Sequence, residues 1–208
     1  LLNALRARGA ASNTLVIVTS DHGESLGENE YYFRHGWYLF DNVLRVPLVV
    51  SFPNEIVGRG VTVAEQVELV DVFHTIRHAA SGLHRADSFA GRGCLLDFAR
   101  WTAVSASGLA PGSQVGAFDR GAARKLAPIG TDLAYSETFL RKQLVGGPPL
   151  FAVRSPRWKY IEPSREPGRT RRWLFDLASD PGETRNVANQ NSEMASLADT
   201  MSARVRAV

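Results

Sequence analysis

One short stretch constrains the fold of this chain more than any other. The residues from Leu15 to Val18 form an uninterrupted and mostly β-branched apolar run, and Asp21-His22-Gly23 follows almost at once. Such a run is typical of a strand buried on both faces, as in parallel α/β sheets, where ligands bind past the carboxyl ends of the strands. Because Asp oxygen and His nitrogen are metal-ligand types, the stretch predicts a metal-binding loop. The same residues also fit an ordinary turn with Asp21 as a cap.

The first region predicted from the chain covers residues 1–130. Its opening residues indicate the end of an amphipathic helix that stops at Gly9, and we therefore expect the sequence to be part of a longer chain. A second buried strand is predicted over residues 46–52, and Asp71 is placed to cap a helix over residues 72–80. The fold class expected here is α/β, with part of a mixed, mostly parallel sheet flanked by helices.

The second predicted region covers residues 131–208. Turn signals rich in Gly and Pro separate four β-rich segments, which predict a small C-terminal antiparallel sheet, at residues 133–139, 151–154, 158–161 and 173–177. After them, apolar residues recur at spacings of three and four and indicate a terminal amphipathic helix with a core-facing stripe, formed by Met194, Leu197, Met201 and Val205.

Composition excludes several classes of function. The chain has 208 residues, of which 44% are hydrophobic and 22% charged, as in an ordinary globular protein. No apolar run approaches the roughly 20 residues that a membrane helix needs, so we expect no membrane span. The net charge of +3 includes an Arg-rich stretch over residues 154–172, but Glu162 and Glu166 interrupt it, and we interpret it as strands and a turn, not as a nucleic-acid surface.

Two further candidates for metal chemistry are weaker. His74 and His78 lie four apart on the predicted helix, a spacing that can bind zinc, but no third ligand is obvious. We interpret them as surface or packing histidines. The single cysteine, Cys94, has no metal-type spacing around it and predicts no intramolecular disulfide.

Three segments together resemble the sulfatase family of the alkaline-phosphatase superfamily. They are residues 13–24 with Asp21-His22-Gly23, residues 35–48 from His35 to the Arg-Val-Pro-Leu ending, and residues 173–186 with Leu-Phe-Asp-Leu-Ala-Ser-Asp-Pro-Gly-Glu-Thr. The segments span nearly the whole chain. The resemblance implies the C-terminal half of a longer sulfatase.

The resemblance also implies roles for individual residues. Asp21 and His22 match two metal ligands, and His35 matches the residue that contacts the sulfate or the leaving-group oxygen. The metal of the family is usually Ca2+, but His22 stands where many members carry Asn, and an imidazole suits Mn2+ or Zn2+ better. A cation and a proton-donating histidine are what a breaking sulfate ester needs, because negative charge develops on its bridging oxygen. Arg45 is expected to be structural, paired with Asp41.

The chain lacks the other half of such a site. The nucleophile of the family is a Cys or Ser in a Cys/Ser-x-Pro-x-Arg motif that is converted to formylglycine. Cys94 does not fit this motif, and Ser155-Pro156-Arg157 has the wrong spacing. Formylglycine and two further Asp ligands are therefore expected only in an N-terminal part. We expect the isolated chain to be inactive towards sulfate esters, and to be poorly soluble or self-associating.

The leading hypothesis is hydrolysis of a small-molecule or carbohydrate sulfate ester. One alternative is a phosphonate or phosphate ester hydrolase of the same superfamily, which the identity of the nucleophile would distinguish. Another is a non-catalytic sulfatase-like binding module, against which the presence of all three site residues argues. The aromatic residues around the loop either line a pocket for the alcohol of the ester or simply pack the loop: Tyr31, Tyr32, Phe33, Trp37 and Tyr38.

Overall fold

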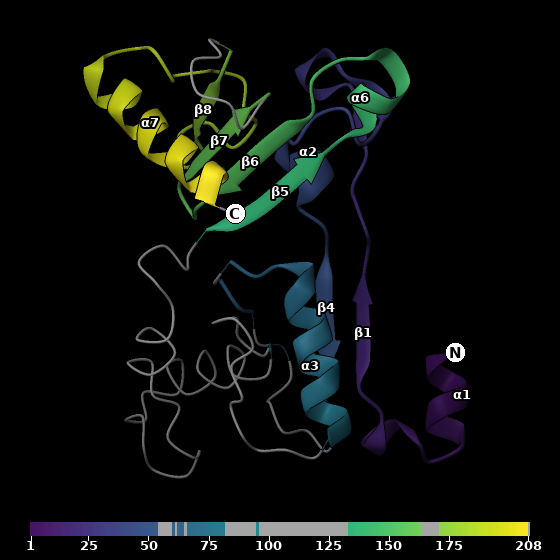
Figure 1. The fold of residues 1–208 in the computed structure, drawn as a ribbon. Coiled ribbons are helices and arrows are strands. Elements are labelled where there is room, and N and C mark those ends of the chain that lie inside the picture. Colours follow the sequence, from purple (N-terminus) through teal and green to yellow (C-terminus); the bar gives the residue numbers. More distant parts are fainter. Residues whose placement is uncertain are drawn as a thin grey trace, which may run out of the picture. The chain divides into compact units, whose positions relative to one another are not determined.

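The computed structural model describes residues 1–53, 60, 62–64, 66–81, 95, 133–163 and 171–207 (Figure 1). The chain divides into two compact units, which are described separately. The first unit holds the described parts of residues 1–19 and 48–131, and the second holds residues 20–47 with the described parts of residues 132–208. The predicted metal-binding loop thus belongs to the same compact unit as the C-terminal strands. Cys94 lies outside the described residues.

The first unit begins with a short helix whose end follows the predicted pattern. Helix α1 spans Leu2–Ala7, and Gly9 takes a φ of +66° after it. Gly9 N–H donates to the Arg6 carbonyl and Ala10 N–H to the Leu5 carbonyl, both over 3.0 Å. These two bonds satisfy carbonyls at the helix end, and the left-handed φ is the reason that glycine ends the helix here. A short 3-10 turn, η1 (Ala11–Asn13), leads into the first strand.

The first strand differs from the prediction, which was a strand in a parallel sheet with both faces buried. Strand β1 (Val16–Thr19) pairs antiparallel with β4 (Leu48–Ser51), and Thr19 lies opposite Leu48. The intervening residues therefore leave and return at the same end of the pair, whereas a parallel pair needs a crossover to the opposite end. No parallel pairing occurs among the described strands. Val18 and Val49 are also largely exposed, at 55% and 62%, so the strand is not buried on both faces.

Helix α3 (Leu69–Ser81) confirms the predicted helix but starts three residues earlier. Asp71 still caps it, from inside the first turn, because its Oδ2 accepts the Glu68 N–H over 2.8 Å. His74 is half-buried beside the ring of Phe73, and the side chain of His78 lies outside the described part of the chain. No helix among the described residues has the length and apolarity to cross a membrane.

The second unit is built on a four-stranded sheet, formed by the four segments that the turn signals separate. Strands β5, β6, β7 and β8 are neighbours in chain order and all pair antiparallel, as Figure 1 shows. Their bounds are Ala134–Thr138, Leu150–Arg154, Trp158–Glu162 and Trp173–Asp176, and helix α6 (Leu140–Val145) connects β5 to β6. The predicted C-terminal antiparallel sheet is thereby confirmed.

Both faces of this sheet are covered, by different parts of the chain. Helix α7 (Ser192–Ala207) packs Met201 and Val205 against one face, which confirms the predicted terminal helix. The other face packs against Leu39 and its neighbours in the loop that follows β1. That loop contains β2 (Ser25–Leu26), the turn η2 (Glu28–Glu30), β3 (Tyr32–Arg34) and helix α2 (Asp41–Leu44). The loop is therefore a structural layer of the second unit.

Candidate functional site

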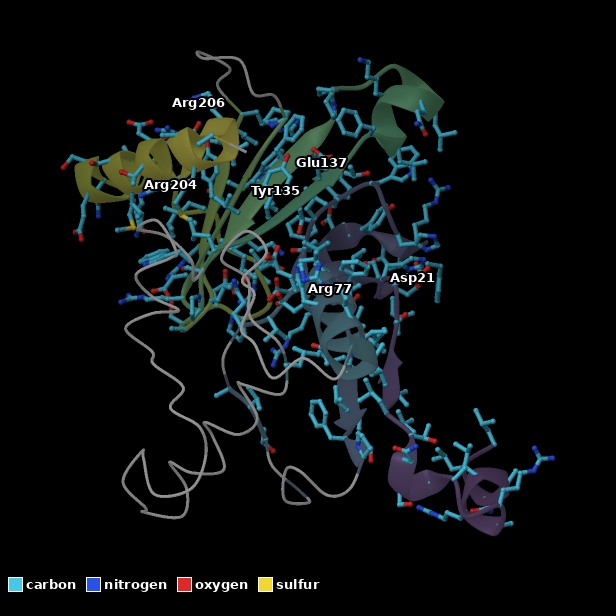
Figure 2. All side chains as sticks on the ribbon, turned by 60° about the horizontal axis from the view of Figure 1, so that its bottom comes forward. Asp21, Arg77, Tyr135, Glu137, Arg204 and Arg206 are labelled. Carbon is cyan, nitrogen blue, oxygen red and sulfur yellow. The ribbon has the colours of Figure 1, made fainter. Side chains whose placement is uncertain are left out.

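The Asp21-His22 pair is held by short-range hydrogen bonds directly after β1 in the sequence. The Ser20 hydroxyl donates to the His22 carbonyl over 2.6 Å, and the His22 N–H donates to Asp21 Oδ1 over 3.0 Å. This N–H bond, helped by the His22 ring, lowers the pKa of Asp21 below its ordinary value. The Asp21 side chain, labelled in Figure 2, is 87% exposed. Asp21 is therefore an accessible carboxylate.

The ring of His22 has one nitrogen committed and one available. Nδ1 lies 2.8 Å from the Gly23 carbonyl oxygen, which only accepts, so Nδ1 carries the hydrogen in this contact. Nε2 then keeps its lone pair, and it lies 3.8 Å from Asp21 Oδ2. An imidazole nitrogen and a carboxylate oxygen are both ligand types for a divalent cation. This donor set fits Mn2+ or Zn2+ better than Ca2+.

His35 lies against His22, as the sequence hypothesis requires of residues that share a site. The two rings stack with centroids 3.9 Å apart and an angle of 21° between their planes. His35 Nδ1 lies 3.0 Å from Glu24 Oε2, so this carboxylate orients the ring. Glu24 was not singled out from the sequence, although it directly follows Gly23. Its position in the Asp-His-Gly-Glu run is the signal that could have identified it.

The backbone after His35 is fixed by the four-stranded sheet. The Thr138 hydroxyl, at the end of β5, donates to the Gly36 carbonyl. Gly36 has a φ of +82°, and a Cβ there would lie 2.9 Å from Leu140 Cδ2. A side chain at this position would be both strained and crowded, so Gly36 allows the loop to pass close to α6.

Gly23 allows a second close approach, between the Asp21-His22 loop and α2. Its N–H donates to the Val43 carbonyl over 2.6 Å, and a Cβ on Gly23 would lie only 2.2 Å from the Asn42 carbonyl oxygen. The sequence predicted this glycine as a sharp turn. The structure gives a different reason, because its φ is not positive and the space is taken by α2.

A buried ionic cluster in turn holds α2 on the sheet. Lys159 on β7 has a fully buried side chain, with Nζ 2.8 Å from Asp41 Oδ1 and 2.9 Å from Glu183 Oε1. Arg154 binds the same Asp41 carboxylate through two nitrogens, with the shortest contact at 3.0 Å. These are the side-chain partners of Asp41, in place of the predicted Arg45. Glu183 belongs to the C-terminal segment that resembles the sulfatases, and its contacts with Asp41 and Lys159 help to hold α2, on which the Asp21-His22 loop packs.

The cluster shifts the pKa values of its two acids, Asp41 and Glu183, in opposite directions. Burial by itself would raise the pKa of Asp41, but Lys159 and Arg154 outweigh it and hold that pKa below its ordinary value. Burial dominates at Glu183 and raises its pKa, although Lys159 opposes the shift. Glu183 is thus the acid whose charge depends most on its single lysine contact.

Asp21 and His22 form at most half of a metal site within the described residues. No cluster of three or more His, Cys, Asp or Glu side chains with metal-binding geometry occurs there.

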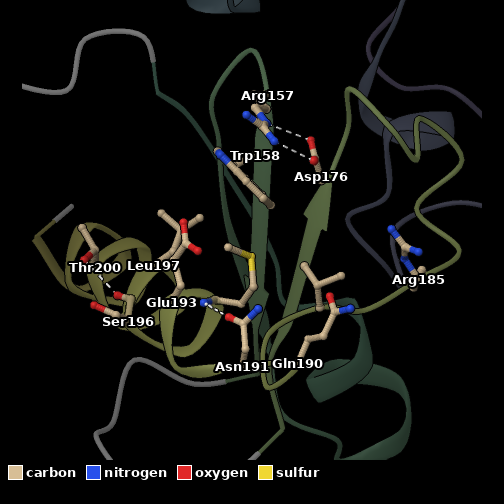
Figure 3. A pocket seen from close by; sticks show the side chains of 12 residues that line it. Arg157, Trp158, Asp176, Arg185, Gln190, Asn191, Glu193, Ser196, Leu197 and Thr200 are labelled. Atoms are coloured by element: carbon tan, nitrogen blue, oxygen red, sulfur yellow. Dashed lines mark hydrogen bonds and ion pairs between the residues drawn. The ribbon is translucent and has the colours of Figure 1, made fainter.

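A separate hollow of about 780 Å3 lies beside the start of α7, where Arg157 and Asp176 pair over 3.0 Å (Figure 3). None of Asp21, His22 and His35 lines it. The candidate site is therefore the open surface around these three residues.

Comparisons with known proteins agree with the motif resemblance. Residues 1–83 match the family model described as Sulfatase. A choline-sulfatase of Rhizobium meliloti is 27% identical over 90% of this chain and 30% of its own length. The solved structure of a phosphonate monoester hydrolase of Agrobacterium radiobacter is 26% identical, with a TM-score of 0.64 over 97% of this chain and 36% of that one. A second solved structure, of a protein with its substrate D-glucosamine-2-N,6-O-disulfate, is 18% identical and also has a TM-score of 0.64. The match covers 99% of this chain and 37% of the chain of that protein. The chain spans about a third of the length of these proteins.

Proposed function

We infer that the chain is a member of the sulfatase family of the alkaline-phosphatase superfamily, and on that premise we propose that Asp21, His22 and His35 form one wall of a metal-dependent site for sulfate-ester hydrolysis. The observation that carries the proposal is the stack of His35 on His22 beside Asp21. In this proposal residues 1–130 contribute to the catalytic α/β domain and residues 131–208 form a C-terminal subdomain. The substrate is a small-molecule or carbohydrate sulfate ester.

The side chains have separate tasks. Asp21 and His22 Nε2 hold a divalent cation, which when bound offsets negative charge on the sulfate group. His35 donates a proton from Nε2 to the oxygen of the leaving alcohol, where charge develops as the S–O bond breaks. Glu24 keeps the ring in place by accepting from Nδ1, so only Nε2 faces the ester. Calcium is the usual metal of the family, but the imidazole of His22 favours Mn2+ or Zn2+.

The nucleophile is proposed to lie on residues other than these 208. The sequence contains no Cys/Ser-x-Pro-x-Arg motif from which formylglycine could form. The purified chain should therefore not turn over 4-nitrophenyl sulfate in the presence of Mn2+, Ca2+ or Zn2+. Turnover that resists an Asp21→Asn substitution would be a contaminant, whereas turnover that depends on Asp21 would overturn this assignment.

A phosphonate or phosphate ester hydrolase is the second candidate. The similarity to the phosphonate monoester hydrolase of Agrobacterium radiobacter favours it, and sulfate and phosphonate groups are both tetrahedral anions. A non-catalytic binding module would use the same surface without His35 as a proton donor. Binding of 4-nitrophenyl sulfate and of a 4-nitrophenyl phosphonate, compared through the NMR signals of the His35 ring, ranks the two anions.

The metal half of the proposal is tested by Mn2+ titration, followed by water-proton relaxation. Asp21→Asn should weaken binding at least about tenfold, since it removes a charged ligand oxygen. Asp199→Asn is the matched control, because its side chain is 70% exposed and takes no part in the site. Equal Mn2+ affinity of the Asp21 variant and the parent chain would refute the metal assignment.

A further inference from the structure

The hairpin between His22 and His35 exposes three large apolar side chains. Leu26, Tyr32 and Phe33 are 63%, 62% and 75% exposed, respectively. Their neighbours Tyr31 and Tyr38 are instead packed edge to face, with ring centroids 5.0 Å apart. Trp37 is half-buried, with the Arg34 guanidinium over its ring. Of the five aromatic residues, Tyr31, Trp37 and Tyr38 therefore have packing partners, whereas Tyr32 and Phe33 are exposed.

Phe33 owes its exposure to an irregularity in the hairpin. Ser25 pairs with Arg34 but Leu26 pairs with Tyr32, so Phe33 is an extra residue without a partner. Its φ is +48°, a conformation that a bulky side chain makes unfavourable. Bulges of this kind occur beside active sites, where they redirect a side chain. The residue whose ring is most exposed thus has a strained backbone, as do Asn29 and Glu30 in the turn of the same hairpin.

Tyr32 and Leu26 form the adjoining surface. They lie directly opposite each other across the two strands, so their side chains share one face. The Tyr32 ring lies against Gly27, where a Cβ would come within 3.0 Å of Tyr32 Cε1. Among the described residues neither Tyr32 nor Phe33 stacks with another ring or carries a cation. Both rings are thus available for stacking, and they do not form a cage of facing rings.

This surface is continuous with the candidate site along the chain. Phe33 precedes His35 by two residues, and two extended residues span at most roughly 7 Å. A substrate whose anionic group lies at His35 would therefore place its alcohol part near the hairpin. The chain on the other side of the hairpin leads through Glu24, which orients His35. Hairpin and site are parts of one loop.

We propose that Leu26, Tyr32 and Phe33 bind the alcohol part of the ester, and that they select alcohols carrying a ring with an apolar face over small alkyl alcohols. This inference rests on the function proposed above. Aryl rings and pyranose rings share this chemistry, because both stack on exposed aromatic side chains. A quaternary ammonium is the competing ligand, and it is best held by several rings around it, which this hairpin does not provide.

The test uses NMR of the 208-residue chain with five probes. Inorganic sulfate should shift the ring signals of His35 and leave those of Tyr32 and Phe33 unchanged. The probes 4-nitrophenol and methyl β-D-glucopyranoside should shift those of Tyr32 and Phe33, and the stronger of the two identifies the class of ring. The ester 4-nitrophenyl sulfate should shift both sets. Choline should shift neither.

Two variants test whether the residues with shifted NMR signals also determine the affinity for the ligand. The double substitution Tyr32→Ser/Phe33→Ser should weaken binding of 4-nitrophenyl sulfate about three- to tenfold, as expected for lost ring stacking, and leave the affinity for inorganic sulfate unchanged. Phe73→Ser is the matched control, because Phe73 on α3 is 61% exposed and lies outside the loop. It should change neither affinity.

The outcomes separate the two proposals. If sulfate shifts His35 but neither ring probe shifts Tyr32 or Phe33, the inference is overturned and the proposed function stands. If choline alone shifts the two rings, the selectivity is overturned. If inorganic sulfate leaves His35 unmoved, the proposed function fails, and the assignment of the hairpin as its alcohol site fails with it.

Discussion

Replacing Lys159 by methionine should weaken the attachment of α2, on which the Asp21-His22 loop packs. Lys159 is fully buried and touches both Asp41 and Glu183, whose side chains are 13% and 2% exposed. Methionine retains most of the buried aliphatic volume, so the substitution removes mainly charge. Asp41 keeps Arg154, but Glu183 loses the cation in contact with it. The loss should therefore fall chiefly on Glu183 and on the attachment of α2.

The expected loss follows from the burial of the pair. Removing one partner of a buried ion pair costs about 3–5 kcal/mol, and since Glu183 can escape in part by protonation we expect about 3 kcal/mol near neutral pH. Burial already raises the pKa of Glu183, and a raised folded-state pKa means stability that is present at low pH and lost as pH rises. Loss of Lys159 also weakens the effect that lowers the pKa of Asp41. Both effects make the deficit larger at high pH.

Urea unfolding, followed by the fluorescence of Trp158 and Trp173 on the sheet, measures the deficit near pH 7.5 and near pH 4.5. Lys142→Met, on the exposed surface of α6, is the control and should change stability by less than about 0.5 kcal/mol. Adding Glu183→Gln to Lys159→Met should restore part of the loss, because it removes the unpaired charge. A Lys159→Met chain within about 0.5 kcal/mol of the parent, or a deficit larger at the lower pH, would refute the reasoning.

Three further predictions concern single positions. Gly23→Ala should lower the free energy of unfolding by about 1–3 kcal/mol and weaken Mn2+ binding, because its Cβ would collide with the Asn42 carbonyl; urea unfolding and Mn2+ titration check this, and unchanged values would contradict it. Phe33→Gly should raise the free energy of unfolding by about 1 kcal/mol in urea, since it relieves a φ of +48°, and a loss would contradict the strain. Burial raises the pKa of Asp71 to about 6, so this carboxyl contributes stability that is lost as pH rises from 3.8 through 6. Asp71→Asn should therefore be more stable than the parent near pH 7.5, by at most about 3 kcal/mol, and the gain should vanish near pH 4; a pH-independent difference would contradict it.

Local patterns in the sequence predicted the local structure well. A glycine after a helical stripe ended α1, and Asp71 capped α3, because both effects act within one turn of the chain. Turn signals located the four C-terminal strands, whose antiparallel order follows from short connections. The spacing of Met201 and Val205 likewise identified the buried face of α7.

The direction of β1 could not be predicted in the same way. An apolar β-branched run fits a strand in any buried sheet, and nothing within it states which strand will pair with it or in which direction. The residues after it could have crossed to the opposite end of the sheet, but they return to the end that they left. Pairing of this kind is decided by the path of the whole loop.

The sequence by itself determined the family resemblance and the proximity of Asp21 to His22, since neighbouring residues stay neighbours in any fold. Only the tertiary structure placed the ring of His35 on that of His22 and gave Glu24 its role. It also decided that Lys159, a charged residue of β7, would be buried against Asp41, a partner 118 residues away. The sequence does not show which residue will pair with a given charge, because the partner can lie far away along the chain. The pair forms only on folding, when the interior of low polarity makes an unpaired charge costly.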